Sequence, residues 1–141
     1  MALDFTSLEK AIASLASALR VATADDGPAG RSEAERDVIR AGVIQNFEFT
    51  YELCWKFIQR WIREYRTAEE ADSARTRNDL FRLAARYHLI RDPTVWFDYA
   101  EARNLTSHAY DAKKAETVFD AAIRFLPEAQ HLLAQLEQIS D

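Results

Sequence analysis

Apolar residues near the start of the chain recur every three or four positions, which is the spacing of one buried helix face. The repeat begins directly after Thr6, and residues 6–9 fit a capping box, in which a Thr hydroxyl and a Glu carboxylate each satisfy an unpaired backbone N–H. We therefore predict a first helix that starts at Thr6. Its buried stripe should comprise Leu8, Ile12, Leu15 and Leu19.

A much longer helix is predicted to follow a Gly- and Pro-containing loop at residues 24–30. A second capping box at residues 32–35 opens this helix, which should reach about Arg66. Its stripe comprises Ile39, Val43, Phe47, Cys54, Ile58, Trp61 and Tyr65. The same helix is apolar on other sides, at Phe49, Leu53, Trp55, Phe57 and Ile62. A helix with one exposed face does not need these additional apolar residues, so we expect part of them to contact another chain. The alternative is that the other helices of the same bundle cover them.

Three further helices complete the pattern. One should cover about 78–88, and Asp92 with Pro93 should start the next, because an acceptor at the cap and a ring without an N–H suit a helix start. On that helix Trp96, Tyr99 or Ala100, and Arg103 share one side. Asp111 should cap the last helix, and Pro127 should bend or break it. The inward residues are expected to be Leu80, Phe81, Leu83 and Ala84, and then Val118, Ala122, Phe125, Leu133, Leu136 and Ile139.

Composition agrees with this helical pattern. Three Gly and three Pro in 141 residues leave little material for β-turns, so we predict an all-α fold, an antiparallel up-and-down four-helix bundle with an additional short helix. Residues 1–141 should form a single domain. No apolar run approaches the roughly 20 residues that cross a bilayer, and a signal peptide is not evident, so we expect a cytoplasmic protein without membrane contact. Cys54 is the sole cysteine, which excludes an internal disulfide and predicts a small core residue.

Charge is unevenly distributed. The net charge of −5 argues against a general nucleic-acid binder, yet residues 60–91 hold eight arginines and five carboxylates. These arginines form either a solvated helical face or a local phosphate-binding patch. Aromatic residues at helical spacing likewise fill a core or interface, or stack on bases. The two sets are Arg60, Arg63, Arg66, Arg75, Arg77, Arg82, Arg86 and Arg91, and Tyr51, Trp55, Trp61, Trp96, Phe97 and Tyr99.

The segment 103–110 sets an arginine, an amide, an imidazole and a phenol side by side, as Arg103, Asn104, His108 and Tyr110. Arginine offers a planar, permanently charged fork that matches phosphate oxygens. Histidine has an unperturbed pKa of about 6.5, which allows proton transfer near neutral pH. If the segment were one regular helix, His108 would face the same way as Asn104, with Arg103 and Tyr110 on a neighbouring side, so we expect the four groups to converge.

This segment resembles the R-x4-H signature of HEPN domains, and its extension to Tyr110 resembles the R-x4-H-x-Y form of HepT-like toxins. Residues 43–56 also resemble the helix of the nucleotidyltransferase substrate-binding protein family, a HEPN branch encoded beside a small nucleotidyltransferase. The resemblance covers nearly the whole chain, and it implies the same four-helix fold.

The resemblance further implies a ribonuclease that needs no metal or cofactor. Arg103 would neutralise the phosphate, His108 would move a proton, and Asn104 would orient an oxygen. Two proton-transfer roles and one histidine imply a homodimer with two motifs in one cleft. In the HepT-like branch the counterpart of Tyr110 receives AMP from the partner nucleotidyltransferase, an antitoxin that silences the toxin.

Two other interpretations remain open at the level of sequence. The chain could be a noncatalytic substrate-binding subunit of a two-component nucleotidyltransferase, in which Arg103 and His108 bind but do no chemistry. It could also be a bundle used only for assembly, which a buried motif would favour. A lone histidine near a helix end is ordinarily a structural residue, and Tyr110 would ordinarily be an amphipathic bundle residue.

Overall fold

A computed structural model describes residues 3–25 and 30–139, and every regular element in those two ranges is helical. In chain order the elements are α1 (Thr6–Thr23), α2 (Glu33–Tyr65), α3 (Ala68–Ser73), α4 (Arg77–Arg86), α5 (Pro93–Leu105), the 3-10 helix η1 (Thr106–His108) and α6 (Ala112–Ile139). The all-α prediction is therefore confirmed. The predicted loop includes residues 26–29, which lie outside the described residues.

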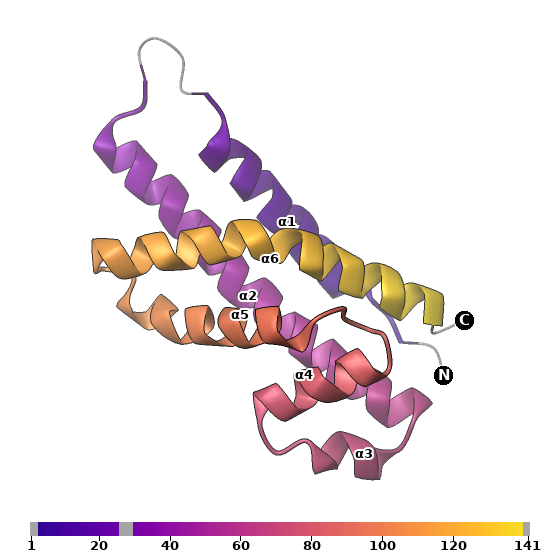
Figure 1. Ribbon diagram of the computed structural model, residues 1–141. Coiled ribbons are helices and arrows are strands. Elements are labelled where there is room, and N and C mark those ends of the chain that lie inside the picture. The colour runs from indigo at the N-terminus through magenta and orange to yellow at the C-terminus, as the bar shows by residue number, and fades with distance from the viewer. Residues whose placement is uncertain (1–2, 26–29, 140–141) are drawn as a thin grey trace.

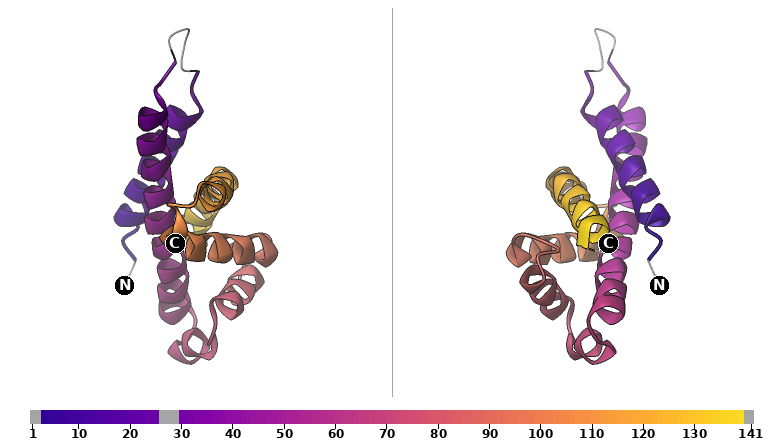
Figure 2. Two further views of the ribbon diagram at one scale, coloured as in Figure 1. Left: turned by 90° about the vertical axis from the view of Figure 1, so that its left-hand side faces the viewer. Right: turned by 90° about the vertical axis from the view of Figure 1, so that its right-hand side faces the viewer.

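Two antiparallel helix pairs make the bundle. Figure 1 shows α1 beside α2 along one diagonal, with α6 crossing them and α5 running back beneath α6. The views in Figure 2 place α3 and α4 together at one end, where they join the end of α2 to the start of α5. The motif segment thus lies on the turn between α5 and α6, against the middle of α2.

Helix starts follow the predicted chemistry with one exception. Both hydrogen bonds of the capping box of α2 are present. The Ser32 hydroxyl accepts from the backbone N–H of Glu35, and the Glu35 carboxylate accepts from the backbone N–H of Ser32. The box predicted at Thr6 is wrong, because Thr6 is already the first helical residue and no side chain forms the cap bond. Asp4 instead accepts hydrogen bonds from both the backbone N–H and the hydroxyl of Thr6. Asp92 and Asp111 accept from backbone N–H groups at the starts of α5 and α6, as predicted.

Phe125 of α6 stands at the centre of an aromatic core. Its ring centroid lies 5.1 Å from that of Phe47 on α2, and 5.6 Å and 5.2 Å from those of Trp96 and Tyr99 on α5. Edge contacts of this kind add about 0.5–1.5 kcal/mol each beyond burial. Tyr51, Trp61, Trp96 and Tyr99 are buried, which confirms the core interpretation for four of the six aromatic residues.

Of the additional apolar residues on α2, some are buried in the bundle and some are exposed. Phe57 and Ile62 are buried within the same chain, as the alternative interpretation required, and Cys54 is fully buried as predicted. Burial raises the pKa of the Cys54 thiol. Leu53 and Trp55 are half-buried. Phe49 remains 59% exposed, so one of these additional apolar residues stays uncovered in the single chain.

The structure adds one helix to the prediction and narrows another prediction, that Pro127 bends or breaks the last helix. No element was predicted at residues 68–73, where Thr67 caps the short helix α3. Pro127 does not break α6, which runs without interruption to Ile139. Pro127 is exposed, and so is Ile123, whose carbonyl loses its helical partner, so the missing hydrogen bond falls on the exposed side of the helix. Regular spacing from Phe125 therefore buries Ala129, Leu132 and Leu136, and it leaves Leu133 and Ile139 half-buried.

Candidate active site

The turn between α5 and α6 is built by short polar side chains. The hydroxyl of Thr106 donates to the carbonyl of Arg103 at 2.7 Å, and the hydroxyl of Ser107 donates to that of Asn104 at 3.3 Å. These groups satisfy the last carbonyls of α5 in place of further helical turns. The α-helix consequently ends at Leu105, and η1 carries the chain to His108.

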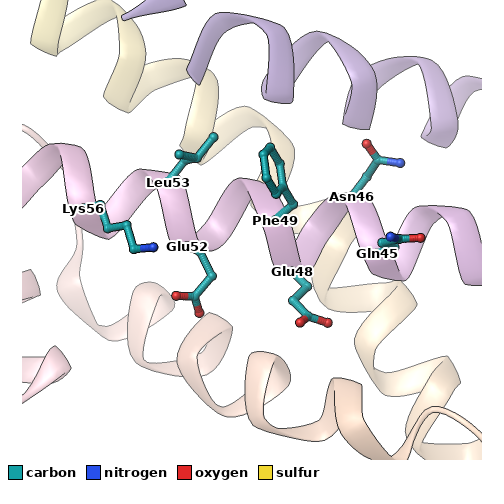
Figure 3. Close-up of a pocket in the computed structure, with 7 residues that line it drawn as sticks. All are labelled: Gln45, Asn46, Glu48, Phe49, Glu52, Leu53 and Lys56. Carbon is teal, nitrogen blue, oxygen red and sulfur yellow. The ribbon is translucent and has the colours of Figure 1, made fainter. Parts of the chain in front are cut away.

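Arg103 is held against α2 by two carboxylates. Its Nε donates to Glu52 Oε1 at 2.9 Å, and one terminal nitrogen lies 3.4 Å from Glu48 Oε1. The other terminal nitrogen donates to the Thr106 hydroxyl at 3.1 Å. Figure 3 shows Glu48 and Glu52 pointing toward α5, away from Phe49 and Leu53. A guanidinium carries five N–H donors, so groups on both terminal nitrogens remain for a phosphate.

Glu52 is fixed through both of its oxygens. While Oε1 accepts from Arg103, Oε2 accepts from the indole N–H of Trp55 at 3.0 Å. The Arg103 and Glu52 side chains are 30% and 31% exposed, so this ion pair is partly desolvated. Such a pair positions a guanidinium more firmly than a fully exposed one does. Glu52 is therefore a positioning residue for Arg103.

Asn104 and Arg103 share a small pocket with α2 and α4. Its other lining residues are Tyr51, Glu52, Arg77 and Ala100, and its volume is about 220 Å³. Burial raises the pKa of Tyr51 to about 12, against the opposing charge of Arg77. The hydroxyl of Tyr51 therefore stays protonated at neutral pH. The pocket combines two guanidinium groups with an amide and a phenol.

His108 and Tyr110 form a second pair of side chains after α5. Both are exposed, Tyr110 to 85%, and their ring centroids lie 6.1 Å apart. Tyr110 lines a groove of about 560 Å³ together with Glu48, Arg40 and Thr106. Glu48 thus lines this groove and also pairs with Arg103. The motif is not buried, which removes the ground for the assembly-only interpretation.

The expected convergence of the four groups is only partly present. The structure brings Arg103 together with Asn104, and His108 together with Tyr110. Within the described ranges, no hydrogen bond, ion pair or ring contact joins the first pair to the second. The reason is the early end of α5, since residues 103–110 do not form one regular helix.

Sequence reasoning missed Glu48 and Glu52. Their spacing of four places them on one helix face, and two carboxylates within the apolar segment 43–56 were the available signal. No group of three or more potential metal-ligating side chains is found in the part of the chain that the structure describes. The described helices also include none that is long and apolar enough to cross a membrane.

The fold and the site define a class of protein, an all-helical bundle that presents an arginine and a histidine on the turn between its last two helices. Residues 3–138 match the family described as nucleotidyltransferase substrate binding protein like. The chain belongs to this family.

Known relatives agree with that assignment. A Haemophilus influenzae protein named "Probable ribonuclease HepT" is 40% identical over 103 residues, which cover 73% of this chain and 70% of the relative. A solved structure from the same species, described as the fold of a substrate binding domain of a nucleotidyltransferase, matches with a TM-score of 0.88. It is 33% identical and covers 95% of this chain and 99% of its own. A solved structure from Thermus thermophilus has a TM-score of 0.71 at 28% identity, covering 92% and 98% of the two chains.

Proposed function

We propose that this protein is a HepT-like HEPN ribonuclease toxin that cleaves RNA without a metal or cofactor. One observation carries the proposal. Arg103 is oriented by Glu52 at the end of α5, and the 3-10 segment that starts three residues later ends in the exposed His108. The name of the Haemophilus influenzae relative supports the same activity. The site should act in the cytoplasm, where RNA is the substrate.

The reaction is an internal attack within RNA. The ribose 2′-oxygen forms a bond to the adjacent phosphorus, and the bond from phosphorus to the 5′-oxygen of the next nucleotide breaks. Arg103 stabilises the charge that develops on the phosphate oxygens, and Asn104 orients one of them. His108 accepts the 2′-hydroxyl proton or donates a proton to the departing oxygen. The products are a 2′,3′-cyclic phosphate and a free 5′-hydroxyl.

A homodimer would supply the second proton-transfer group. One His108 can serve one role at a time, so two motifs facing a common cleft would provide an acid and a base. The uncovered face of α2 supports this assembly. Its groove of about 740 Å³ is lined entirely by residues 45–56 of α2 and includes the exposed Phe49 beside Glu48 and Glu52 (Figure 3).

The partner we propose is a cognate minimal nucleotidyltransferase that acts as the antitoxin and adenylylates Tyr110. The family description and the exposure of the Tyr110 phenol support this proposal. An AMP group there would place a bulky anion beside the site and repel an incoming RNA backbone. A second candidate function is the noncatalytic substrate-binding subunit of that nucleotidyltransferase, which the description of the matched solved structure favours.

Cleavage by the pure protein separates the two candidates. We expect His108→Ala and Arg103→Ala each to abolish cleavage of a single-stranded RNA while the thermal midpoint stays within about 5 °C. Arg103→Lys should also be strongly impaired, because lysine keeps the charge but loses the fork. Cleavage should persist in EDTA and leave 2′,3′-cyclic phosphate ends. A parent protein without activity, or one that EDTA inactivates, would favour the binding subunit.

A further inference from the structure

Most of the eight arginines between residues 60 and 91 already have partners. Ion pairs join Arg63 to Asp72, Arg82 to Asp79 and Arg91 to Glu128. Arg60 and Arg66 lie over aromatic rings, at 4.8 Å from the centroid of Phe57 and 4.6 Å from that of Tyr87. These five residues are thus used in packing and surface pairing.

Arg77 differs from these residues in its surroundings. Its guanidinium carbon lies 3.4 Å from the centroid of the Trp55 ring, and the side chain is half-buried at the start of α4. Within the described ranges, no carboxylate forms an ion pair with Arg77. A partly desolvated cation without a counter-ion is unfavourable, and stacking on an indole offsets only part of that cost. The guanidinium also hydrogen-bonds the side chain of Tyr51, and its other N–H groups are available to an anion.

A chain of contacts fixes Arg77 relative to the motif. Arg77 stacks on Trp55, the Trp55 indole donates to Glu52, and Glu52 accepts from Arg103. Both guanidinium groups and Asn104 line the same pocket of about 220 Å³. Pockets for whole drug-sized ligands measure about 300–1,000 Å³, so this one suits a phosphate with part of its ribose. Because the pocket encloses only one such unit, its two arginines can hold the phosphates on either side of one ribose.

We propose that Arg77 is a substrate-binding residue that holds an RNA backbone phosphate next to the one held by Arg103. The inference rests on the proposed ribonuclease function and adds to it the path of the strand, from the α5–α6 turn toward the start of α4. Arg77 contacts a phosphate that does not react. It therefore contributes equally to substrate and transition-state binding, which affects KM and leaves kcat nearly unchanged.

Arg60→Gln is a matched control for Arg77→Gln. Both changes remove one positive charge from an arginine stacked on an aromatic residue of α2, but Arg60 lies over Phe57 and does not line the pocket. Binding is measured by fluorescence anisotropy with a 2′-O-methyl oligoribonucleotide, which cannot be cleaved, from low to high salt. Steady-state cleavage of the matching RNA gives KM and kcat.

We expect Arg77→Gln to weaken binding about 10-fold and to lower the slope of log K against log salt by about 0.7, which corresponds to one single-strand phosphate contact. KM should rise by a similar factor, while kcat stays within about 3-fold. Arg77→Lys should keep the parent salt slope, because its charge remains. Arg60→Gln should match the parent in affinity and slope.

Equal behaviour of the two Gln variants, with a parent that cleaves RNA, would overturn the role of Arg77 and leave the proposed function intact. A parent that neither binds nor cleaves would overturn both. Should Arg77→Gln fold poorly, Arg77→Met replaces it, because an unbranched apolar side chain suits the half-buried position and also removes the charge, and the same losses of affinity and salt slope are expected. A loss of kcat without a change in KM for that variant contradicts a role in holding an unreactive phosphate.

Discussion

Tyrosines in this protein occupy two contrasting environments. Tyr51 and Tyr99 are buried, and desolvation raises the pKa of each to about 12. The hydroxyl of Tyr99 also donates to the carbonyl of Arg124 at 3.1 Å. Tyr110 is 85% exposed beside His108. A modifying enzyme can reach the phenol of Tyr110 without unfolding the bundle, whereas those of Tyr51 and Tyr99 are covered.

We expect the cognate nucleotidyltransferase, with ATP and Mg²⁺, to add one or more AMP groups to Tyr110. RNA cleavage should fall as the modified fraction rises, because the added phosphate repels the substrate backbone. Intact-mass analysis measures the gain, with Tyr87→Phe as a control that keeps Tyr110. An equal gain of mass on Tyr110→Phe would remove Tyr110 from the regulation and leave inhibition by simple binding.

At the scale of elements, Arg103 of α5 is joined to α2 by two carboxylates of that helix. Glu52 is fixed by Trp55 and holds the Nε of the arginine, whereas Glu48 approaches a terminal nitrogen at 3.4 Å and is 42% exposed. The two carboxylates therefore have different consequences for an RNA phosphate. Glu52 orients the fork, and Glu48 is the more exposed of the two negative charges that a phosphate meets at Arg103.

These roles predict opposite effects of two isosteric substitutions. Glu52→Gln should lower kcat/KM about 10-fold or more, since a misplaced guanidinium loses alignment with the phosphate. Glu48→Gln should strengthen RNA binding, because it removes a negative charge that competes with the substrate. Steady-state kinetics and anisotropy on both variants measure these effects. If both variants weaken binding alike, the proposed division of roles is wrong.

The sequence predicts a helix start well where a capping residue lies next to it in the chain. Ser32, Asp92 and Asp111 cap helices as expected, because each needs only neighbours within three residues. The predicted cap at Thr6 is wrong because Asp4, two residues earlier, accepts from the Thr6 N–H and the helix already includes Thr6. The early end of α5 depends on Thr106 and Ser107, whose bonds to carbonyls compete with helix formation in a way that periodicity does not register.

Only part of the candidate site can be predicted from the sequence, because the other part is assembled by the packing of separate helices. Arg103, Asn104, His108 and Tyr110 lie on one segment, so their chemistry could be inferred from sequence alone. Their partners Glu52 and Arg77 come from α2 and α4, and only the packing of these helices brings them to Arg103. The spacing of residues along the chain carries no information on which face of α2 meets α5.

For the whole molecule, the groove on α2 is a candidate surface for assembly. Phe49 lies there, at the same level as the carboxylates that hold Arg103 (Figure 3). Covering Phe49 with a second copy would bury apolar surface worth about 1.5–3 kcal/mol per fully buried side chain, and a symmetric dimer does so twice. Assembly and the active site would then use different sides of the same stretch of α2.

We expect a homodimer in solution at micromolar concentration, and Phe49→Asp should weaken it by at least about 100-fold. Val38→Asp is the matched control, because Val38 is also on α2 and 73% exposed but does not line the groove. Light scattering across a dilution series measures the mass of each variant. A monomeric parent, or a dimer equally sensitive to both changes, would exclude this face as the interface.

Burial of Cys54 has a practical consequence for measuring the motions of the bundle. Its side chain is fully covered in the core, and burial raises the pKa of the thiol, so a thiol reagent cannot react with it in the closed state. Labelling requires α2 to separate from its neighbours. The rate at which Cys54 is labelled therefore measures how often the core opens, and no engineered probe is needed. The same rate can be followed as RNA or the nucleotidyltransferase binds.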